Sequence, residues 1–136
     1  MTVFVDTSAF YALLDPDGKE YQPALAALVA LRERRRPLIT HEYVVVETFS
    51  LTQRRLGLTA AGRFVSELLP LVDEVWVDRQ LQREAIEAVF AGGIRGTSLV
   101  DRTSFLVMRR HGITTAFAFD ADFAAQGFEV IPAVRE

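Results

Sequence analysis

Four acidic residues stand out in the 136-residue sequence, because each occupies a position at which chemistry can be done. Asp6 and Asp120 each follow directly on a short apolar segment that predicts a buried strand. Asp101 lies near the start of a predicted helix, and Glu47 lies inside another. Ligands of a parallel sheet bind beyond the carboxyl ends of the strands, so we expect Asp6 and Asp120 at one edge of such a sheet.

Helix capping is the competing explanation for three of these acids. An Asp at the start of a helix accepts hydrogen bonds from free backbone amides, which would account for Asp6 and Asp120 without any catalysis. Ser98 and Asp101 have the spacing of a capping box, although Glu or Gln is usual at the second position. Taken singly, each of these residues is open to both explanations.

Glu47 is not explained by capping, because it lies within the predicted helix 41–56. Its neighbours three and four residues away are mostly large and apolar or aromatic: Tyr43, Val44, Ser50 and Leu51. A carboxylate on such a face is costly unless a cation meets it. That cation could be a buried Arg in a salt bridge or a bound metal ion.

The four carboxylates, if they converge, would repel one another and resist joint ionisation. A divalent cation relieves this repulsion, and carboxylate oxygens without His or Cys favour Mg²⁺ or Mn²⁺. Such an ion would lower the pKa of a bound water and supply hydroxide for phosphodiester hydrolysis. We expect Asp6 and Asp101 to bind the ion directly. Glu47 and Asp120 would complete the cluster.

The elements that must position these acids alternate between short strands and helices. The predicted strands are 3–5, 38–40, 75–77, 115–119 and 128–131. The predicted helices, with their caps, are 7–14, 21–36, 41–56, 59–69, 78–90 and 97–111. This alternation predicts an α/β fold of three layers, α/β/α, around a central and mostly parallel sheet of about five short strands. The length fits one domain, residues 1–136.

Composition limits the classes of function. No cysteine is present, which excludes disulfides, thiolate zinc sites and a cysteine nucleophile. We find neither a signal peptide nor an apolar stretch long enough for a bilayer, and therefore expect a soluble, cytoplasmic protein without a membrane partner. The net charge of −3 is not that of a general nucleic-acid binder. Fourteen of the 15 basic residues are Arg, which suits phosphate contacts, but a GC-rich genome gives the same bias.

Four segments, in this order, resemble the motifs of PIN-domain ribonucleases, and more closely those of the VapC-type toxins of toxin–antitoxin pairs. They are VFVDTSAF at 3–10, Ile39-Thr40 followed by Glu47, SLVD at 98–101 and FDADF at 119–123. The segments are spread over nearly the whole chain. One departure concerns the fourth motif, which usually carries Thr or Ser two residues before its Asp. Ala118 stands at that position.

The resemblance implies a PIN-like endoribonuclease that uses Mg²⁺ or Mn²⁺ and acts as the toxin of a pair. Its catalytic acids would be Asp6, Glu47, Asp101 and Asp120, and these together with Asp122 would bind the metal. The family varies in which late acid it uses, so Asp122 competes with Asp120 for the fourth position. Supporting roles fall to Thr7, Ser8 and Ser98. The implied partners are an RNA substrate, a cognate antitoxin and a second copy in a homodimer. The apolar helical segments 24–31 and 64–71 are candidate surfaces for them, although packing in the core is the more common role of such segments.

The His and Arg residues have weaker assignments. His41 opens the helix that carries Glu47, but a role as general base is not favoured because the metal already supplies hydroxide. His111 is expected at a helix C-terminus. Contacts to RNA phosphates are open to Arg54, Arg55, Arg95 and Arg102, although a solvated surface position is the more common role.

Three other functions were weighed. The segment AFAFDAD at 116–122 suggests a phosphatase of the haloacid dehalogenase type, but no Lys follows it. A receiver-like phospho-acceptor also needs a Lys near its acids, and Lys19 is badly placed. The third alternative is a PIN-like module that binds RNA or protein without catalysis, against which the presence of all four acids argues.

Overall fold

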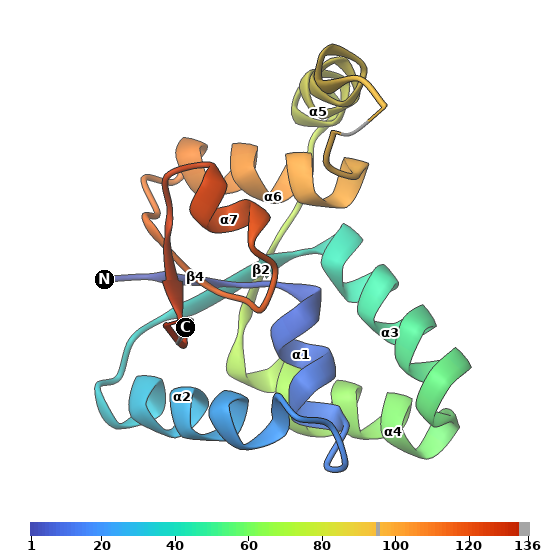
Figure 1. Cartoon of the computed structure of the whole chain (residues 1–136), viewed down its shortest axis with the longest axis vertical. Helices are drawn as coiled ribbons and strands as arrows, with labels where there is room; N and C mark the ends of the chain where they lie inside the picture. The colour runs from blue at the N-terminus through green and yellow to red at the C-terminus, as the bar shows by residue number, and fades with distance from the viewer. Residues whose placement is uncertain (95, 134–136) are drawn as a thin grey trace.

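The computed structural model describes residues 1–94 and 96–133 of the chain (Figure 1). Its centre is a sheet of five strands in the order β3-β2-β1-β4-β5, and every neighbouring pair is parallel. The strands are β1 (Val3–Val5), β2 (Leu38–His41), β3 (Asp73–Val75), β4 (Thr115–Phe117) and β5 (Glu129–Ile131). The predicted α/β fold is therefore confirmed.

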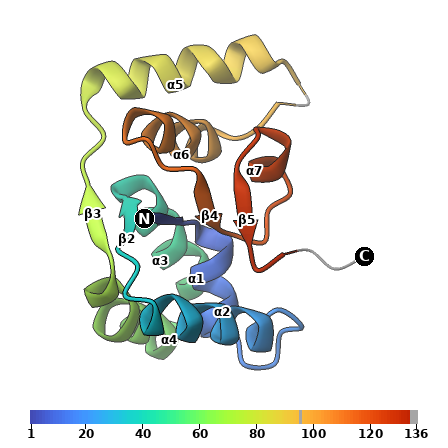
Figure 2. The ribbon, with the colours of Figure 1, turned by 90° about the vertical axis from the view of Figure 1, so that its left-hand side faces the viewer.

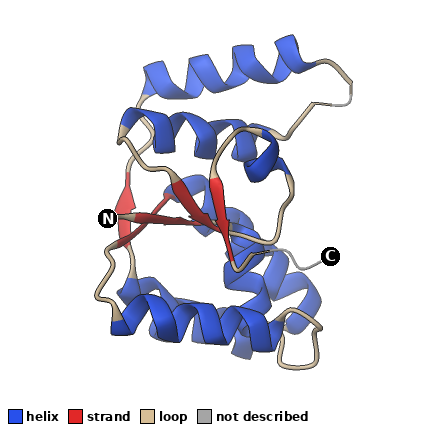
Figure 3. Ribbon diagram, turned by 60° about the vertical axis from the view of Figure 1, so that its left-hand side comes forward, coloured by secondary structure: helices blue, strands red, loops and turns tan. Residues whose placement is uncertain are grey.

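Helices cover both faces of this sheet. They are α1 (Thr7–Leu14), α2 (Tyr21–Glu33), α3 (Glu42–Leu56), α4 (Leu58–Arg63), α5 (Arg79–Gly92), α6 (Leu99–Arg110) and α7 (Asp122–Ala125). Helices α6 and α7 lie on one side with α5 stacked outside α6, and α1, α2 and α4 lie on the other side (Figures 2 and 3). The three predicted layers are present.

The three inner strands, β2, β1 and β4, are buried, as is usual for parallel strands between helical layers. All residues of β1 and β4 are buried, with Phe4 and Phe117 fully so. Phe123 of α7 lies 6.1 Å from Phe4 and 5.0 Å from Phe105 of α6, measured between ring centroids. This aromatic cluster attaches the helices of one layer to the middle of the sheet.

The parallel arrangement brings the carboxyl ends of the strands to one edge. There β1 leads into α1, β2 leads into α3, and β4 leads through a short turn into α7. Helix α6, which precedes β4, begins at Leu99, and its N-cap Ser98 lies at the same edge as Asp6 and Asp120. The four segments that carry the candidate acids therefore meet at this edge of the sheet.

Several predicted boundaries are wrong, and three segments differ most in character. The predicted strand 75–77 is β3 at 73–75, because its register is set by pairing with β2, and Trp76 lies beyond it, exposed. The predicted strand 115–119 ends at Phe117. The predicted helix 59–69 starts at Leu58 and continues as a π-helical turn, Phe64–Leu68, and a 3₁₀ turn, Leu69–Leu71. The last two short turns precede β3.

Helix α2 ends at Glu33, three residues before the predicted end, and Arg35 then takes a left-handed backbone conformation with φ of 52°. Among the described residues, no helix combines the length and the apolar character that crossing a bilayer requires.

Candidate active site

The four predicted acids line one depression of about 370 Å³ at the carboxyl edge of the sheet. Asp6 comes from the β1–α1 junction, Glu47 from α3, Asp101 from α6 and Asp120 from the turn after β4. Glu20, directly before α2, is a fifth acid in the lining. It was missed because it stands in a turn, in no motif and after no strand.

Asp101, Asp120 and Asp122 approach one another most closely. One carboxylate oxygen of each lies within 4.8 Å of the others, a spacing that one cation can bridge. Asp120 lines the depression, and its Oδ1 accepts a hydrogen bond of 2.9 Å from the backbone amide of Asp122. Asp120 and Asp122, which we expected to compete for one position, therefore lie next to each other. Asp122 is in the first turn of α7.

Asp6 caps α1 and also lines the depression, so the two explanations of this residue are compatible. Its Oδ2 accepts hydrogen bonds from the Ser8 amide at 3.1 Å and the Ser8 hydroxyl at 2.6 Å. The same hydroxyl accepts a hydrogen bond of 2.9 Å from the amide of Phe119, next to Asp120. Ser8 therefore ties Asp6 to the strand end that precedes Asp120, close to where Ala118 lacks a hydroxyl.

Glu47 is half-buried on α3, as its apolar neighbours predicted. Among the described residues it takes part in no ion pair, so the salt-bridge explanation is not supported. Beside it, the Thr48 hydroxyl lies 3.3 Å from the hydroxyl of Thr7 and joins α3 to α1. Thr7 thus holds the helix that carries Glu47.

Ser98 is the N-cap of α6, because its hydroxyl accepts a hydrogen bond of 3.1 Å from the Asp101 amide. This is the first half of the predicted capping box. The second half would need the Asp101 carboxylate to accept from the Ser98 amide, and no such bond is formed. Capping therefore explains Ser98. The carboxylate of Asp101 takes no part in it and lines the depression instead.

The electrostatics of the cluster match the predicted repulsion. Burial, and to a smaller extent the neighbouring charges of Asp6, Asp120, Glu47 and Asp122, together raise the pKa of Asp101 to about 7. Burial also raises the pKa of Asp6 to about 6, against the hydrogen bonds from Ser8. Asp6 and Asp101 therefore resist ionisation, first because they are buried and second because other carboxylates are close.

The basic residues differ in their relation to the depression. Arg55 lines it, with its guanidinium 5.8 Å from the centre of the Tyr11 ring. Arg102 lies against Gly92 at the end of α5, and Arg54 is exposed away from the lining residues. Arg95 lies outside the described residues.

The two histidines take structural positions. His41 is the N-cap of α3, is fully buried and does not line the depression. His111 is exposed at the C-terminus of α6, as predicted.

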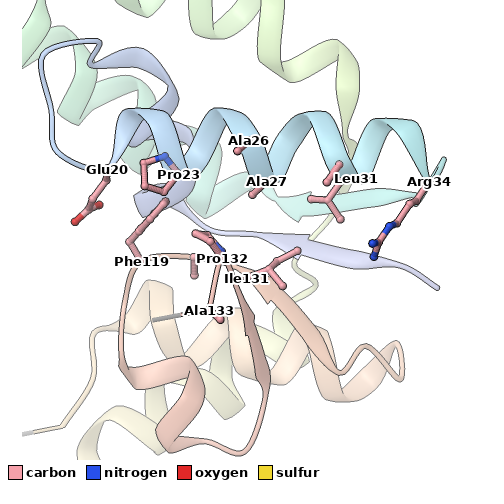
Figure 4. A pocket seen from close by; sticks show the side chains of 12 residues that line it. Glu20, Pro23, Ala26, Ala27, Leu31, Arg34, Phe119, Ile131, Pro132 and Ala133 are labelled. Atoms are coloured by element: carbon pink, nitrogen blue, oxygen red, sulfur yellow. The ribbon is translucent and has the colours of Figure 1, made fainter. Parts of the chain in front are cut away.

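A larger, apolar pocket of about 750 Å³ lies between α2 and the segments that follow β4 and β5 (Figure 4). Pro23 and Leu31 of α2 line one wall, and Phe119 and Pro132 line the other. Glu20 borders both the pocket and the depression, so the two cavities adjoin.

Comparison with known proteins decides the family, because the pattern of the PIN domain matches residues 3–129. The chain belongs to the PIN-domain family. It is 39% identical over 132 residues to the 23S rRNA-specific endonuclease VapC20 of Mycobacterium tuberculosis, covering 96% of this chain and 98% of that protein. The resemblance to VapC-type members is thereby confirmed, and so is the expectation of a nuclease, since this relative is named an endonuclease.

Solved structures agree. The crystal structure of the VapC20 toxin, described as cleaving the sarcin–ricin loop, has a TM-score of 0.80 and 36% identity, covering 93% of this chain and 95% of that one. FitAcB from Neisseria gonorrhoeae has a TM-score of 0.69 at 17% identity, with 96% of both chains covered, which shows the PIN fold alone. PIN membership leaves the phosphatase and receiver alternatives without support.

Proposed function

We propose that this chain, as one PIN-like domain over residues 1–136, is a divalent-cation-dependent endoribonuclease and the toxin of a toxin–antitoxin pair. One observation carries the proposal: carboxylates from four separate elements line a single depression at the carboxyl edge of the sheet. That edge is where parallel sheets bind ligands.

The residues present fit Mg²⁺ or Mn²⁺. The donors are carboxylate oxygens, which such ions prefer. Burial and neighbouring carboxylates raise the pKa of Asp6 and Asp101, and a bound cation would offset both effects by stabilising the ionised form. Asp6, Asp101 and Asp120 would hold the ion, with Glu47 and Asp122 completing the cluster. When bound, the ion would activate water and stabilise charge on the phosphate undergoing attack.

The remaining residues position the acids and the substrate. Ser8 holds Asp6 through two hydrogen bonds, and Thr7 fixes α3 through Thr48. Arg55 is the basic residue of the lining, and a guanidinium binds a phosphate through two parallel hydrogen bonds. We assign it to the RNA backbone next to the cleaved bond.

The substrate proposal follows the relative VapC20, which is named for 23S rRNA and described as cleaving the sarcin–ricin loop. We propose that this chain cleaves the same loop, in the cytoplasm where ribosomes are found. Sequence-specific readers of RNA usually target such unpaired loops. The alternative of a non-catalytic RNA-binding module keeps the same fold and differs only in the outcome of a cleavage assay.

The test uses a labelled RNA hairpin with the sarcin–ricin sequence and a hairpin of equal length with a scrambled loop. With Mg²⁺ we expect one cut in the first hairpin and none in the second, and with EDTA no cut in either. Asp101→Asn should lower the rate at least about 100-fold, as expected when a group that stabilises transition-state charge is lost. Asp73→Asn, at an exposed edge-strand position, is the matched control.

Three results would contradict the proposal. Cleavage that persists in EDTA would exclude the cation, and full activity of Asp101→Asn would exclude the site. A folded wild-type protein that binds the hairpin but never cuts it, with Mg²⁺ or Mn²⁺, would instead support the non-catalytic module.

The apolar pocket along α2 is our proposed docking site for the antitoxin. It includes part of the predicted surface 24–31, and its border with the acids through Glu20 lets a docked segment reach the active site. Ala27→Arg, in this pocket, should abolish inhibition by the co-expressed antitoxin while RNA cleavage remains. Inhibition equal to that of the wild type would contradict this placement.

The second predicted surface, 64–71, is less suited because Phe64 and Leu68 are buried. The homodimer stays a prediction, for which the mass in solution is the measurement.

A further inference from the structure

His41 is a fully buried ionisable side chain to which the proposed chemistry gives no role. It ends β2, and the rings of Phe4 and Tyr43 lie 5.7 and 5.8 Å from its own. An apolar ring would fill this place without the cost of burying polar atoms. The two ring nitrogens therefore need their own explanation.

Both nitrogens form hydrogen bonds. Nδ1 accepts from the Val44 amide at 3.4 Å, and Nε2 lies 2.9 Å from the hydroxyl of Ser104. Because the amide is the donor, Nδ1 carries no proton and Nε2–H donates to Ser104. Burial lowers the pKa of His41 to about 4, which keeps the ring neutral at physiological pH. The Ser104 hydroxyl in turn donates to the carbonyl of Val100 at 3.0 Å.

This series of bonds joins the two helices that carry acids of the active site. Val44 lies in the first turn of α3, three residues before Glu47. Val100 and Ser104 delimit the turn of α6 that contains Asp101. A shift of one helix against the other would stretch the bond between the imidazole and the hydroxyl.

We infer that His41 is a positioning residue, which holds the turn of α6 carrying Asp101 against the start of α3 and so sets the spacing of the carboxylates. The inference rests on the proposed function, because it concerns how the same cation-binding cluster is held. His41 itself touches neither the cation nor RNA in this role.

Two variants cut the connection from opposite sides. Ser104→Ala removes the bridging hydroxyl and keeps the cap of α3. His41→Asn keeps a cap acceptor, since Asn is favoured there, but is too short to reach Ser104. We expect Mn²⁺ affinity, measured by calorimetry, to fall roughly tenfold in each, the lower end of the loss seen when groups that orient metal ligands are removed.

Kinetics separate positioning from damage to the fold. At a fixed, limiting cation concentration kcat for RNA should fall while KM for RNA stays unchanged, and excess Mn²⁺ should restore part of the rate. The double variant should be no weaker in Mn²⁺ binding than either single one, because both changes cut one connection.

Thr52→Ala is the matched control. Its hydroxyl is buried on α3 and has no hydrogen-bond partner among the described residues, so the change costs packing without touching the connection. We expect this variant to keep the Mn²⁺ affinity of the wild type. If His41→Asn does not fold, Ser104→Ala and this control carry the test by themselves.

The inference would be overturned if folded Ser104→Ala bound Mn²⁺ as tightly as the wild type. It would also be overturned if the losses of Mn²⁺ affinity in the two single variants simply added in the double variant. The proposed function fails separately: in that case the wild-type protein itself neither binds Mn²⁺ nor cleaves RNA, and the inference fails with it.

Discussion

At the scale of single residues, local structure and chemistry use the same side chains in this protein. Asp6 caps α1 through its Oδ2 and also lines the depression. In α6 the cap is Ser98, so the carboxylate of Asp101 takes no part in capping. A capping motif at a strand end is therefore compatible with a catalytic role. Burial and neighbouring charge then decide the behaviour of each carboxylate.

The raised pKa values predict how cation binding depends on pH. Asp101 and Asp6, with pKa values of about 7 and 6, must lose their protons before they can bind a cation. Protons therefore compete below these values, and we expect Mn²⁺ affinity to rise steeply from pH 5 to 7 and to level off above 8. Calorimetry across this range is the measurement, with Asp101→Asn lacking the step near 7. An affinity that is constant from pH 5.5 to 8 would show that these protons are not linked to binding.

At the scale of elements, the sequence predicts features that depend on neighbouring residues, such as helix caps. It does not predict which residues of distant strands pair with each other. The caps at Asp78 and Ser98 are readable from the sequence, because each depends on bonds within its own helix. The position of β3 depends on which residues of β2 it pairs with, so the apolar Val75-Trp76-Val77 misled the prediction. The acids at strand ends could be predicted once the sheet was taken as parallel.

The short helix α7 gives a prediction at this scale. Its four residues cannot hold a helix by themselves, and Phe123 attaches it to Phe4 and Phe105. Phe123→Ala should lower the free energy of unfolding by about 3–5 kcal/mol, the usual cost of emptying such a position. Phe90→Ala, at an exposed position of α5, should change it by less than about 0.5 kcal/mol. Urea unfolding followed by circular dichroism compares them, and equal losses would contradict the anchoring role of Phe123.

At the scale of the whole molecule, the candidate active site lies between two groups of helices. Asp6 and Glu47 come with α1 and α3, whereas Asp101 and Asp122 come with α6 and α7 on the other side of the sheet (Figure 1). The cluster is complete only when both groups pack on the sheet. Neither Glu20 nor the apolar pocket could be predicted from the sequence, because both arise where α2 meets the turns after β4 and β5.

The central claim is that these carboxylates jointly hold a divalent cation. Anomalous diffraction from crystals soaked in Mn²⁺ tests it most directly, since manganese is located independently of any assumed chemistry. We predict a peak bounded by carboxylate oxygens of Asp101, Asp120 and at least one of Asp6 and Glu47, and no such peak in Asp101→Asn. An empty depression in the wild type at millimolar Mn²⁺, while the same protein cleaves RNA, would contradict the account.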